Sequence, residues 1–101
     1  MSYERIMGLE VIDQDIYQEY REAMMPILAT FGGAFTFDFK VSEVLLSKSD
    51  ANINRLFTIR FPSKKHMKDF FSNSDYLAVK AKYFEKSVKS VTIISLHEVS
   101  E

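Results

Sequence analysis

Two neighbouring segments with strictly alternating apolar side chains place the tightest constraint on what this chain can fold into. They are AFTFDFKV, residues 34–41, and RLFTIRF, residues 55–61, and a polar connection centred on residues 47–54 separates them. Alternation with a period of two over about seven residues is typical of strands with one apolar face. The pattern predicts a β-hairpin. Other parts of the chain must cover it, because an isolated hairpin of this kind exposes a contiguous apolar patch.

A turn near Ser49 defines the register that we expect for this hairpin. The pairs that then lie opposite each other are Phe37 with Phe61, Phe39 with Ile59, and Val41 with Phe57. The same register sets Asp38 opposite Arg60, and such an opposite-charge pair contributes roughly 0.2–1 kcal/mol. We therefore expect helices to cover the face that carries Phe35, Phe37 and Phe39. Asp38 and Arg60 are expected on the other face, either as a polar pair in the cleft of a dimer or as a purely structural ion pair.

The segment before the hairpin predicts a strand and then a helix. Met7 and Leu9 belong to an alternating pattern over residues 3–12, within which Gly8 indicates a bulge or a close approach by another part of the chain. Asp13 is a favourable N-cap for the helix that follows.

This first helix is expected to run to about Phe31, with apolar residues at helical spacing. Pro26 lies inside it and predicts a kink, because proline removes one backbone hydrogen bond. Gly32 is expected to supply the left-handed cap that ends the helix.

The segment after the hairpin predicts two more helices and a strand. Ser63 is a good N-cap for a helix over residues 64–72, and Ser74 for another over residues 75–85. Residues 88–99 are rich in β-branched side chains and alternate, as strands do. The element order is therefore βαββαβ, which predicts an α+β, ferredoxin-like fold in which helices cover one face of an antiparallel sheet.

Length and topology together bear on domain number and assembly. A chain of 101 residues is suited to a single domain spanning residues 1–101. The second face of its sheet has no helix to cover it, and an open sheet edge and an uncovered face commonly pair with a second subunit. We expect a homodimer.

Composition narrows the function classes. The sequence has no cysteine, so a thiolate zinc site and a cysteine nucleophile are excluded, and its three glycines form no phosphate-binding loop. Its lysines are interspersed with acidic residues, which favours a solvated face over a nucleic-acid patch. No apolar run approaches the length of a membrane span or a secretory signal. We expect a cytoplasmic protein with no membrane or nucleic-acid partner.

The two histidines do not predict a metal site. His66 and His97 are far apart in the sequence, and two separated histidines do not form a zinc site. His66 with Asp69 has the spacing of a metal or haem pair, but the first turn of a lysine-rich helix is usually solvated. His97 is more often an edge or interface residue than a catalytic base. We expect no metal and no cofactor.

Aromatic side chains on the first helix give the most specific prediction of a site. Tyr17 and Tyr20 are three residues apart and so lie close together on the helix surface. Simple core packing accounts for them, but they also suit the mouth of an apolar pocket above the sheet. The residues that we expect to line this pocket are Tyr17, Tyr20, Met24, Phe37, Phe57, Phe71 and Tyr76.

An ordered set of short motifs resembles one known family. In order they are Asp13 followed by Tyr17-x-x-Tyr20-Arg21, then Pro26, Gly32-Gly33, an apolar strand ending in Phe61-Pro62-Ser63, and Phe70-Phe71-Ser72-Asn73-Ser74-Asp75-Tyr76. The set resembles the domain-of-unknown-function family 1330 of the dimeric α+β barrel superfamily, over nearly the whole chain. Many members have Trp-Tyr and a Ser-Pro-Glu-Tyr type turn where this chain has Phe70-Phe71 and Ser74-Asp75-Tyr76. The resemblance implies a dimeric ferredoxin-like fold without an established activity.

Three functions are compatible with these patterns. The one we favour is a small homodimeric binding or accessory protein whose aromatic-lined pocket takes a small apolar molecule. The second is an enzyme of the cofactor-independent monooxygenase or isomerase type, a class that the superfamily resemblance implies. The third is a structural or protein-interaction module with a filled core.

Overall fold

A computed structural model of the chain describes residues 1–100. Its elements, in chain order, are β1 (Ser2–Val11), α1 (Gln14–Thr30), β2 (Ala34–Lys40), β3 (Arg55–Phe61), α2 (Lys64–Ser72), α3 (Ser74–Val79), the π-helical turn η1 (Lys80–Phe84), α4 (Glu85–Ser87) and β4 (Val88–Val99). This βαββαβ order confirms the α+β, ferredoxin-like fold that the sequence predicts. β4 has the predicted bounds.

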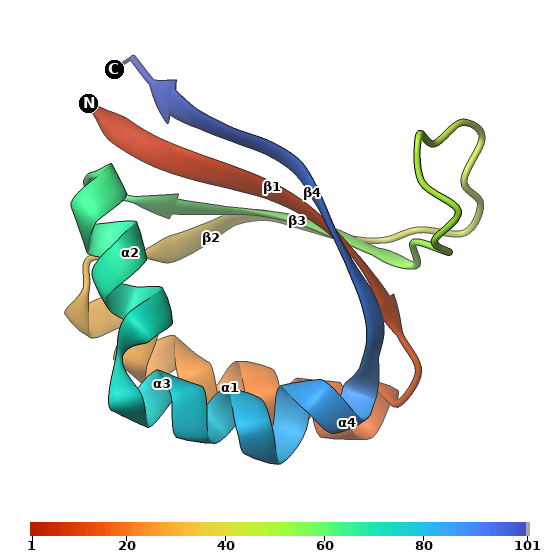
Figure 1. Ribbon diagram of the computed structural model, residues 1–101, viewed down its shortest axis with the longest axis horizontal. Helices are drawn as coiled ribbons and strands as arrows, with labels where there is room; N and C mark the ends of the chain where they lie inside the picture. The colour runs from red at the N-terminus through yellow and green to blue at the C-terminus, as the bar shows by residue number, and fades with distance from the viewer. Residues whose placement is uncertain (101) are drawn as a thin grey trace.

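The four strands form one antiparallel sheet in the order β2-β3-β1-β4. Figure 1 shows the helices together on one side of this curved sheet, while its other side has no helix over it. We call the helix-covered side the inner face and the other side the outer face. The core lies between the inner face and the helices, where Phe61 and Phe70 are almost completely buried.

Side-chain N-caps mark the starts of α1 and α2, as predicted. Asp13 Oδ1 accepts a hydrogen bond of 3.0 Å from the backbone N–H of Ile16, and Ser63 Oγ accepts one of 3.2 Å from His66. Gly32 follows α1 with a φ of 72°, the left-handed conformation expected of it. α1 continues through Pro26 as a single helix.

The cap of α3 differs from the prediction by one residue. Asn73, and not Ser74, is the N-cap, because its Oδ1 accepts hydrogen bonds of 3.0 Å from the backbone N–H groups of Asp75 and Tyr76. The expected helix over residues 75–85 is a continuous helical segment from Ser74 to Ser87 that contains the turn η1. Such π-helical turns inside a helix are rare and often lie at functional sites.

The predicted register of the hairpin is wrong. Phe35 pairs with Ile59, but the next partners are Phe37 with Thr58 and Phe39 with Leu56, so Thr36 is an extra residue in β2. This bulge, together with the long connection between β2 and β3, displaces every pair from the predicted register. Val41 lies beyond the end of β2, where its backbone N–H donates to the carbonyl of Asn54 at 2.9 Å.

The bulge also reverses the faces of the side chains that follow it, as any one-residue shift in a strand does. Phe35 stays on the inner face, but Phe37 and Phe39 are on the outer face, 60% and 52% exposed. Asp38, which was expected on the outer face, faces inward opposite Phe57. The prediction that helices cover all three phenylalanines therefore holds for Phe35 alone.

Gly8 and Asn54 bring the segment before β3 close to the C-terminal half of β1. A Cβ at Gly8 would lie 2.8 Å from the side chain of Ile53, so the close approach expected at this glycine is confirmed. Asn54 pairs with the end of β1 through its side chain: its Oδ1 accepts from the N–H of Val11, and its Nδ2 donates to the carbonyl of the same residue, both at 2.8 Å. These contacts anchor the start of β3 to β1.

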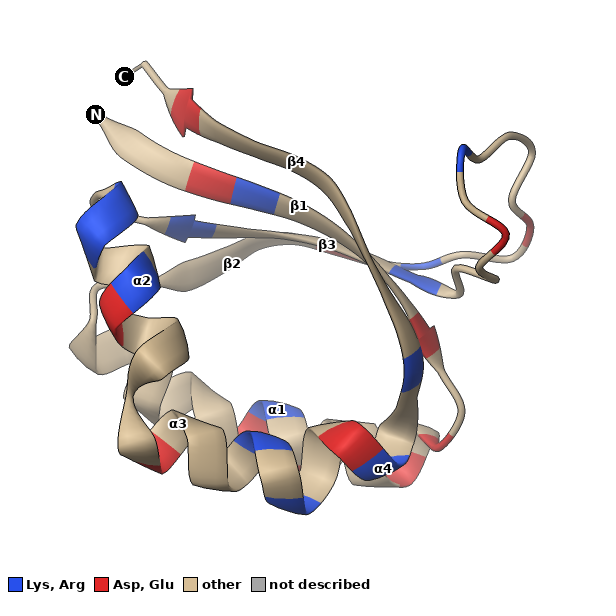
Figure 2. Cartoon of the chain, in the orientation of Figure 1, with Lys and Arg blue, Asp and Glu red and all other residues tan. Residues whose placement is uncertain are grey.

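Charges of both signs lie on the same helices (Figure 2). On α2, for example, Lys65 pairs with Asp69 at 2.7 Å across one helical turn. Among the described residues, no helix is long and apolar enough to cross a membrane.

Candidate functional site

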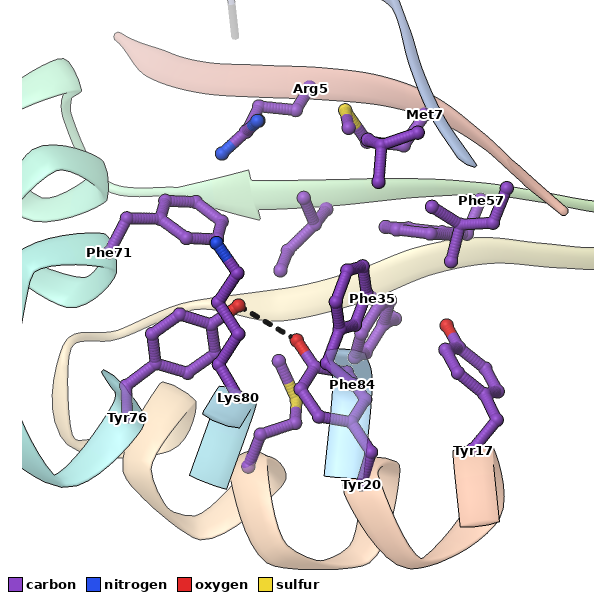
Figure 3. Close-up of a pocket in the computed structure, with 14 residues that line it drawn as sticks. Arg5, Met7, Tyr17, Tyr20, Phe35, Phe57, Phe71, Tyr76, Lys80 and Phe84 are labelled. Atoms are coloured by element: carbon purple, nitrogen blue, oxygen red, sulfur yellow. Dashed lines mark hydrogen bonds between the residues drawn. The ribbon is translucent and has the colours of Figure 1, made fainter. Parts of the chain in front are cut away.

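A cavity of about 270 Å³ lies between the inner face of the sheet and the helices (Figure 3). The sheet and the helical segment from α3 to η1 contribute to its wall, and α1 forms its opposite side. The residues that line it are Arg5, Met7, Leu9, Tyr17, Tyr20, Met24, Phe35, Phe57, Ile59, Phe71, Tyr76, Lys80, Phe84 and Val91. Val91 on β4 is the most open of these, at 49% exposure, so the cavity opens beside the edge of the sheet.

Most of the residues expected around a pocket lie together here. The structure places Tyr17, Tyr20, Met24, Phe57, Phe71 and Tyr76 in the lining. Phe37 is a correction, because the bulge at Thr36 turns it to the outer face. Phe35 takes the position expected for Phe37, and its ring packs edge-to-face on Phe57 with centroids 5.4 Å apart.

Several lining residues were not predicted, although the sequence carries a signal for some of them. Arg5 alternates with Met7 and Leu9 in the first strand, and the same period of two that places those two inside also places Arg5 there. Lys80 and Phe84 follow Tyr76 at intervals of four residues, which is the spacing of one helical face.

Two phenols meet inside the cavity. The hydroxyls of Tyr20 and Tyr76 are 2.9 Å apart and share one hydrogen bond, drawn as the dashed line in Figure 3. Both side chains are at least nine-tenths buried. Burial raises the pKa of each of these hydroxyls above its ordinary value, so both phenols stay protonated at neutral pH.

Next to the cavity, a network of charges holds the third phenol. Arg21 is buried on α1, and its Nε donates to the hydroxyl of Tyr17 at 2.8 Å. Its two terminal nitrogens donate to both oxygens of Asp38, at 3.2 and 3.3 Å. Arg55 donates to the same carboxylate at 2.7 and 2.8 Å. Burial raises the pKa of Tyr17 and Arg21 counteracts it only in part, so this phenol also remains protonated.

Asp38 and Arg60 do not form the predicted pair. Asp38 faces inward to the two arginines just described, whereas Arg60 donates to Glu4 at 3.2 Å on the outer face. His97 also contacts Glu4, with Nε2 and Oε1 3.2 Å apart, so this histidine belongs to a cluster across neighbouring strands. The bulge at Thr36 turns Asp38 inward, and the observed register sets Arg60 opposite Ala34 instead of Asp38.

Arg5 is a charged residue of the cavity whose guanidinium contacts an aromatic ring and no anion that the structure describes. Its guanidinium lies 4.2 Å from the centre of the Phe71 ring, toward which it points in Figure 3. Its Nε is buried and has no hydrogen-bond partner among residues 1–100. Desolvation lowers the pKa of this guanidinium from its ordinary value, and the group still stays charged at neutral pH, as arginine side chains in proteins do.

The chemistry available in this cavity is that of an apolar container with hydrogen-bond donors. The described lining residues offer phenols, one guanidinium and one ammonium, on a surface of aromatic and aliphatic side chains. Within the described part of the chain, no three histidine, aspartate or glutamate residues come together as metal ligands.

The sheet, its one-sided layer of helices and the cavity between them define a ferredoxin-like α+β protein. The chain belongs to the family described as Domain of unknown function (DUF1330), which its sequence matches over residues 5–96. The comparison with curated proteins found no match.

Solved structures with the same fold extend across bacteria. A protein of unknown function from Rhodopseudomonas palustris is 13% identical, with a TM-score of 0.82 over 99% of this chain and 83% of that chain. A dabb family protein with a ferredoxin-like fold from Mesorhizobium loti is 11% identical, with a TM-score of 0.68 over 99% and 98%. A protein of unknown function from Bacteroides fragilis, described as dimeric with a ferredoxin-like fold, is 14% identical, with a TM-score of 0.61 over 97% and 96%. At these identities the likeness shows the fold.

Proposed function

We propose that this protein is a homodimeric binding module that takes a small, largely apolar molecule into the cavity between its sheet and its helices. The observation that carries the proposal is the cavity itself, which is lined mainly by aromatic and aliphatic side chains with a few placed polar groups. This composition is typical of small-molecule sites.

The size of the cavity indicates a compact ligand. A dry cavity of roughly 150 Å³ holds benzene, and pockets for drug-sized ligands run from about 300 to 1,000 Å³. At about 270 Å³, this cavity suits a molecule larger than benzene and no larger than a small bicyclic compound.

The polar groups favour binding over proton-transfer catalysis. A general base must accept a proton near neutral pH. The three phenols of the cavity have raised pKa values, and no carboxylate or imidazole is among the described lining residues. The site is therefore better suited to hold a ligand through hydrogen-bond donors than to remove a proton from it.

Exposed aromatic side chains on the outer face of the sheet support the proposal of a dimer. Phe37 and Phe39 stack on each other with ring centroids 6.0 Å apart, and both are more than half exposed. An exposed aromatic patch on an uncovered sheet face is typical of a subunit contact. A second copy of the chain is a suitable partner, since similar folds from Bacteroides fragilis and Thermobifida fusca are described as dimeric.

Calorimetric titration of a small aromatic probe tests the binding function. We expect 1-naphthoate or its neutral amide, 1-naphthamide, to bind the wild type saturably. Met24→Trp should abolish binding, because the larger side chain fills the cavity that Met24 lines.

The matched control is Met25→Trp, at the neighbouring position on α1, where the side chain is 50% exposed and lies outside the cavity. This variant should bind as the wild type does. Absence of binding by either probe, or equal binding by both tryptophan variants, would contradict the proposal.

A further inference from the structure

We propose that the natural ligand is a small carboxylate with an apolar body, whose anionic group is held by Arg5 and Lys80 at the Phe71–Tyr76 end of the cavity. This inference rests on the proposed binding function and adds the chemical class of the ligand. It comes from an imbalance in the cavity, where hydrogen-bond donors and positive charges have too few acceptors.

Positive charge is the first part of this imbalance. The lining contains one arginine and one lysine and, among the described residues, no aspartate or glutamate. Neither Arg5 nor Lys80 has an ion pair within residues 1–100, and the buried Nε of Arg5 lacks a hydrogen-bond partner. A half-buried guanidinium without an anion is unfavourable, because burial removes its hydration without replacing it.

Arg21 shows how this protein pairs a buried guanidinium with a carboxylate, which Arg5 lacks. That guanidinium is also buried, but both oxygens of Asp38 accept hydrogen bonds from it. Arg5 has the same chemistry and an aromatic ring at 4.2 Å, and it lacks the carboxylate. A ligand carboxylate would supply to Arg5 what Asp38 supplies to Arg21, in the two-oxygen geometry that guanidinium groups favour.

The phenols are the second part of the imbalance. Tyr20 and Tyr76 have two O–H groups between them but share a single hydrogen bond, so one proton has no acceptor among the described residues. The hydroxyl of Tyr17 accepts from Arg21, and its own proton likewise has no described acceptor. Since all three side chains are buried, the missing acceptors point to a ligand that brings oxygen atoms into the cavity.

The position of these donors sets the orientation of the ligand. Lys80 lies one helical turn after Tyr76, and Phe71 lies under the guanidinium of Arg5, so the cations gather at the Phe71–Tyr76 end of the cavity. The other end is formed by the rings of Phe35 and Phe57, beside Tyr17, and the guanidinium of Arg21, already paired with Asp38, lies 3.9 Å from the centre of the Phe35 ring. The carboxylate therefore faces the cations, and the apolar body lies on the two phenylalanines.

Paired probes test the charge preference. Titration calorimetry at pH 7 compares 1-naphthoate with 1-naphthamide, which has the same ring and no charge. We expect the wild type to bind the carboxylate at least about tenfold more tightly than the amide. A hydrogen bond to a charged group contributes enough free energy to account for a difference in affinity of this size. Arg5→Met should remove the preference, because it weakens binding of the carboxylate probe and leaves binding of the amide probe unchanged. Lys80→Met should reduce the preference.

Lys82→Met is the control, because Lys82 is an exposed lysine on the same turn and lies outside the lining. Thermal unfolding of each variant checks folding, and Lys80→Met decides the outcome if Arg5→Met does not fold. Equal binding of the two probes by the wild type, or a carboxylate preference that survives in the folded variants of both cations, would overturn the inference and leave the proposed function standing. Absence of binding by both probes would overturn the two together.

Discussion

Replacement of Asp38 by alanine tests the internal charge network, which is the largest departure of the structure from the sequence-based prediction. The Asp38 carboxylate accepts four hydrogen bonds from two arginines. Arg21 is buried and Arg55 is partly buried, with side-chain exposures of 7% and 14%, while Asp38 itself is 32% exposed. The Asp38→Ala variant therefore leaves two largely buried guanidinium groups without their anion.

The expected loss of stability follows from these exposures. Removal of one partner from a fully buried ion pair costs about 3–5 kcal/mol, and an exposed pair contributes at most about 1 kcal/mol. Because water reaches one side of Asp38, we expect an intermediate loss of about 2–3 kcal/mol at pH 7. Urea unfolding followed by circular dichroism measures it.

The matched control is Asp69→Ala. Asp69 pairs with Lys65 on the surface of α2, where the lysine side chain is 82% exposed. Its removal should cost about 0.5 kcal/mol or less. A loss below about 1 kcal/mol in Asp38→Ala, or equal losses in the two variants, would refute the argument from burial.

The same variant makes a prediction about pH. Burial raises the pKa of Asp38, but the hydrogen bond from Arg55 and the charge of Arg21 outweigh it and hold this pKa below its ordinary value of 3.8. A carboxyl with a depressed folded-state pKa stabilises the fold above its unfolded-state pKa and loses that contribution as the pH falls through the folded-state value. The stability difference between wild type and Asp38→Ala should thus be constant from about pH 5 to 7 and shrink below the ordinary value of 3.8. If the stability difference between wild type and Asp38→Ala grew on acidification, the pKa of Asp38 would be raised in the folded state and not lowered.

Other parts of the structure give their own expectations. Asn54→Ala should lower the free energy of unfolding in urea by about 1–3 kcal/mol, because the backbone of Val11 loses both partners; a loss below about 0.5 kcal/mol would show that water replaces the amide. Phe70→Ala should cost about 3–5 kcal/mol in the same assay, since Phe70 is completely buried, and a smaller cost would place it outside the core. Phe39→Glu should convert a dimer into a monomer in sedimentation velocity, whereas Leu77→Glu, at an exposed position on α3, should not; a monomeric wild type would contradict the dimer.

Local sequence patterns predict most of the fold, because alternation and capping are local. The bounds of β4 and the caps at Asp13 and Ser63 depend on residues a few positions apart. The register of the hairpin depends on the length of its connection, and the faces of Phe37 and Phe39 depend on one extra residue, Thr36, which no glycine or proline marks. A one-residue bulge changes no apolar or polar assignment in the sequence, yet it moves Phe37 to the opposite face.

The site was predictable to the extent that it lies on regular elements. Helical spacing places Tyr17, Tyr20 and Met24 on one face of α1, and all three line the cavity. Arg5 was missed because a charged residue in an alternating strand is ordinarily taken to face solvent. Its burial depends on tertiary packing against Phe71, which is distant in the sequence.

Methyl NMR of the methionines tests the binding cavity most directly. The chain has five methionines, of which Met7 and Met24 line the cavity. Met67 is buried elsewhere in the core and Met25 is half exposed, so these two serve as internal controls. With [¹³C]methyl-methionine protein titrated with 1-naphthoate, we predict saturable shifts of the Met7 and Met24 signals and little change at Met25 and Met67. Shifts confined to Met25, or no saturable shift at Met7 and Met24, would contradict a ligand site between the sheet and the helices.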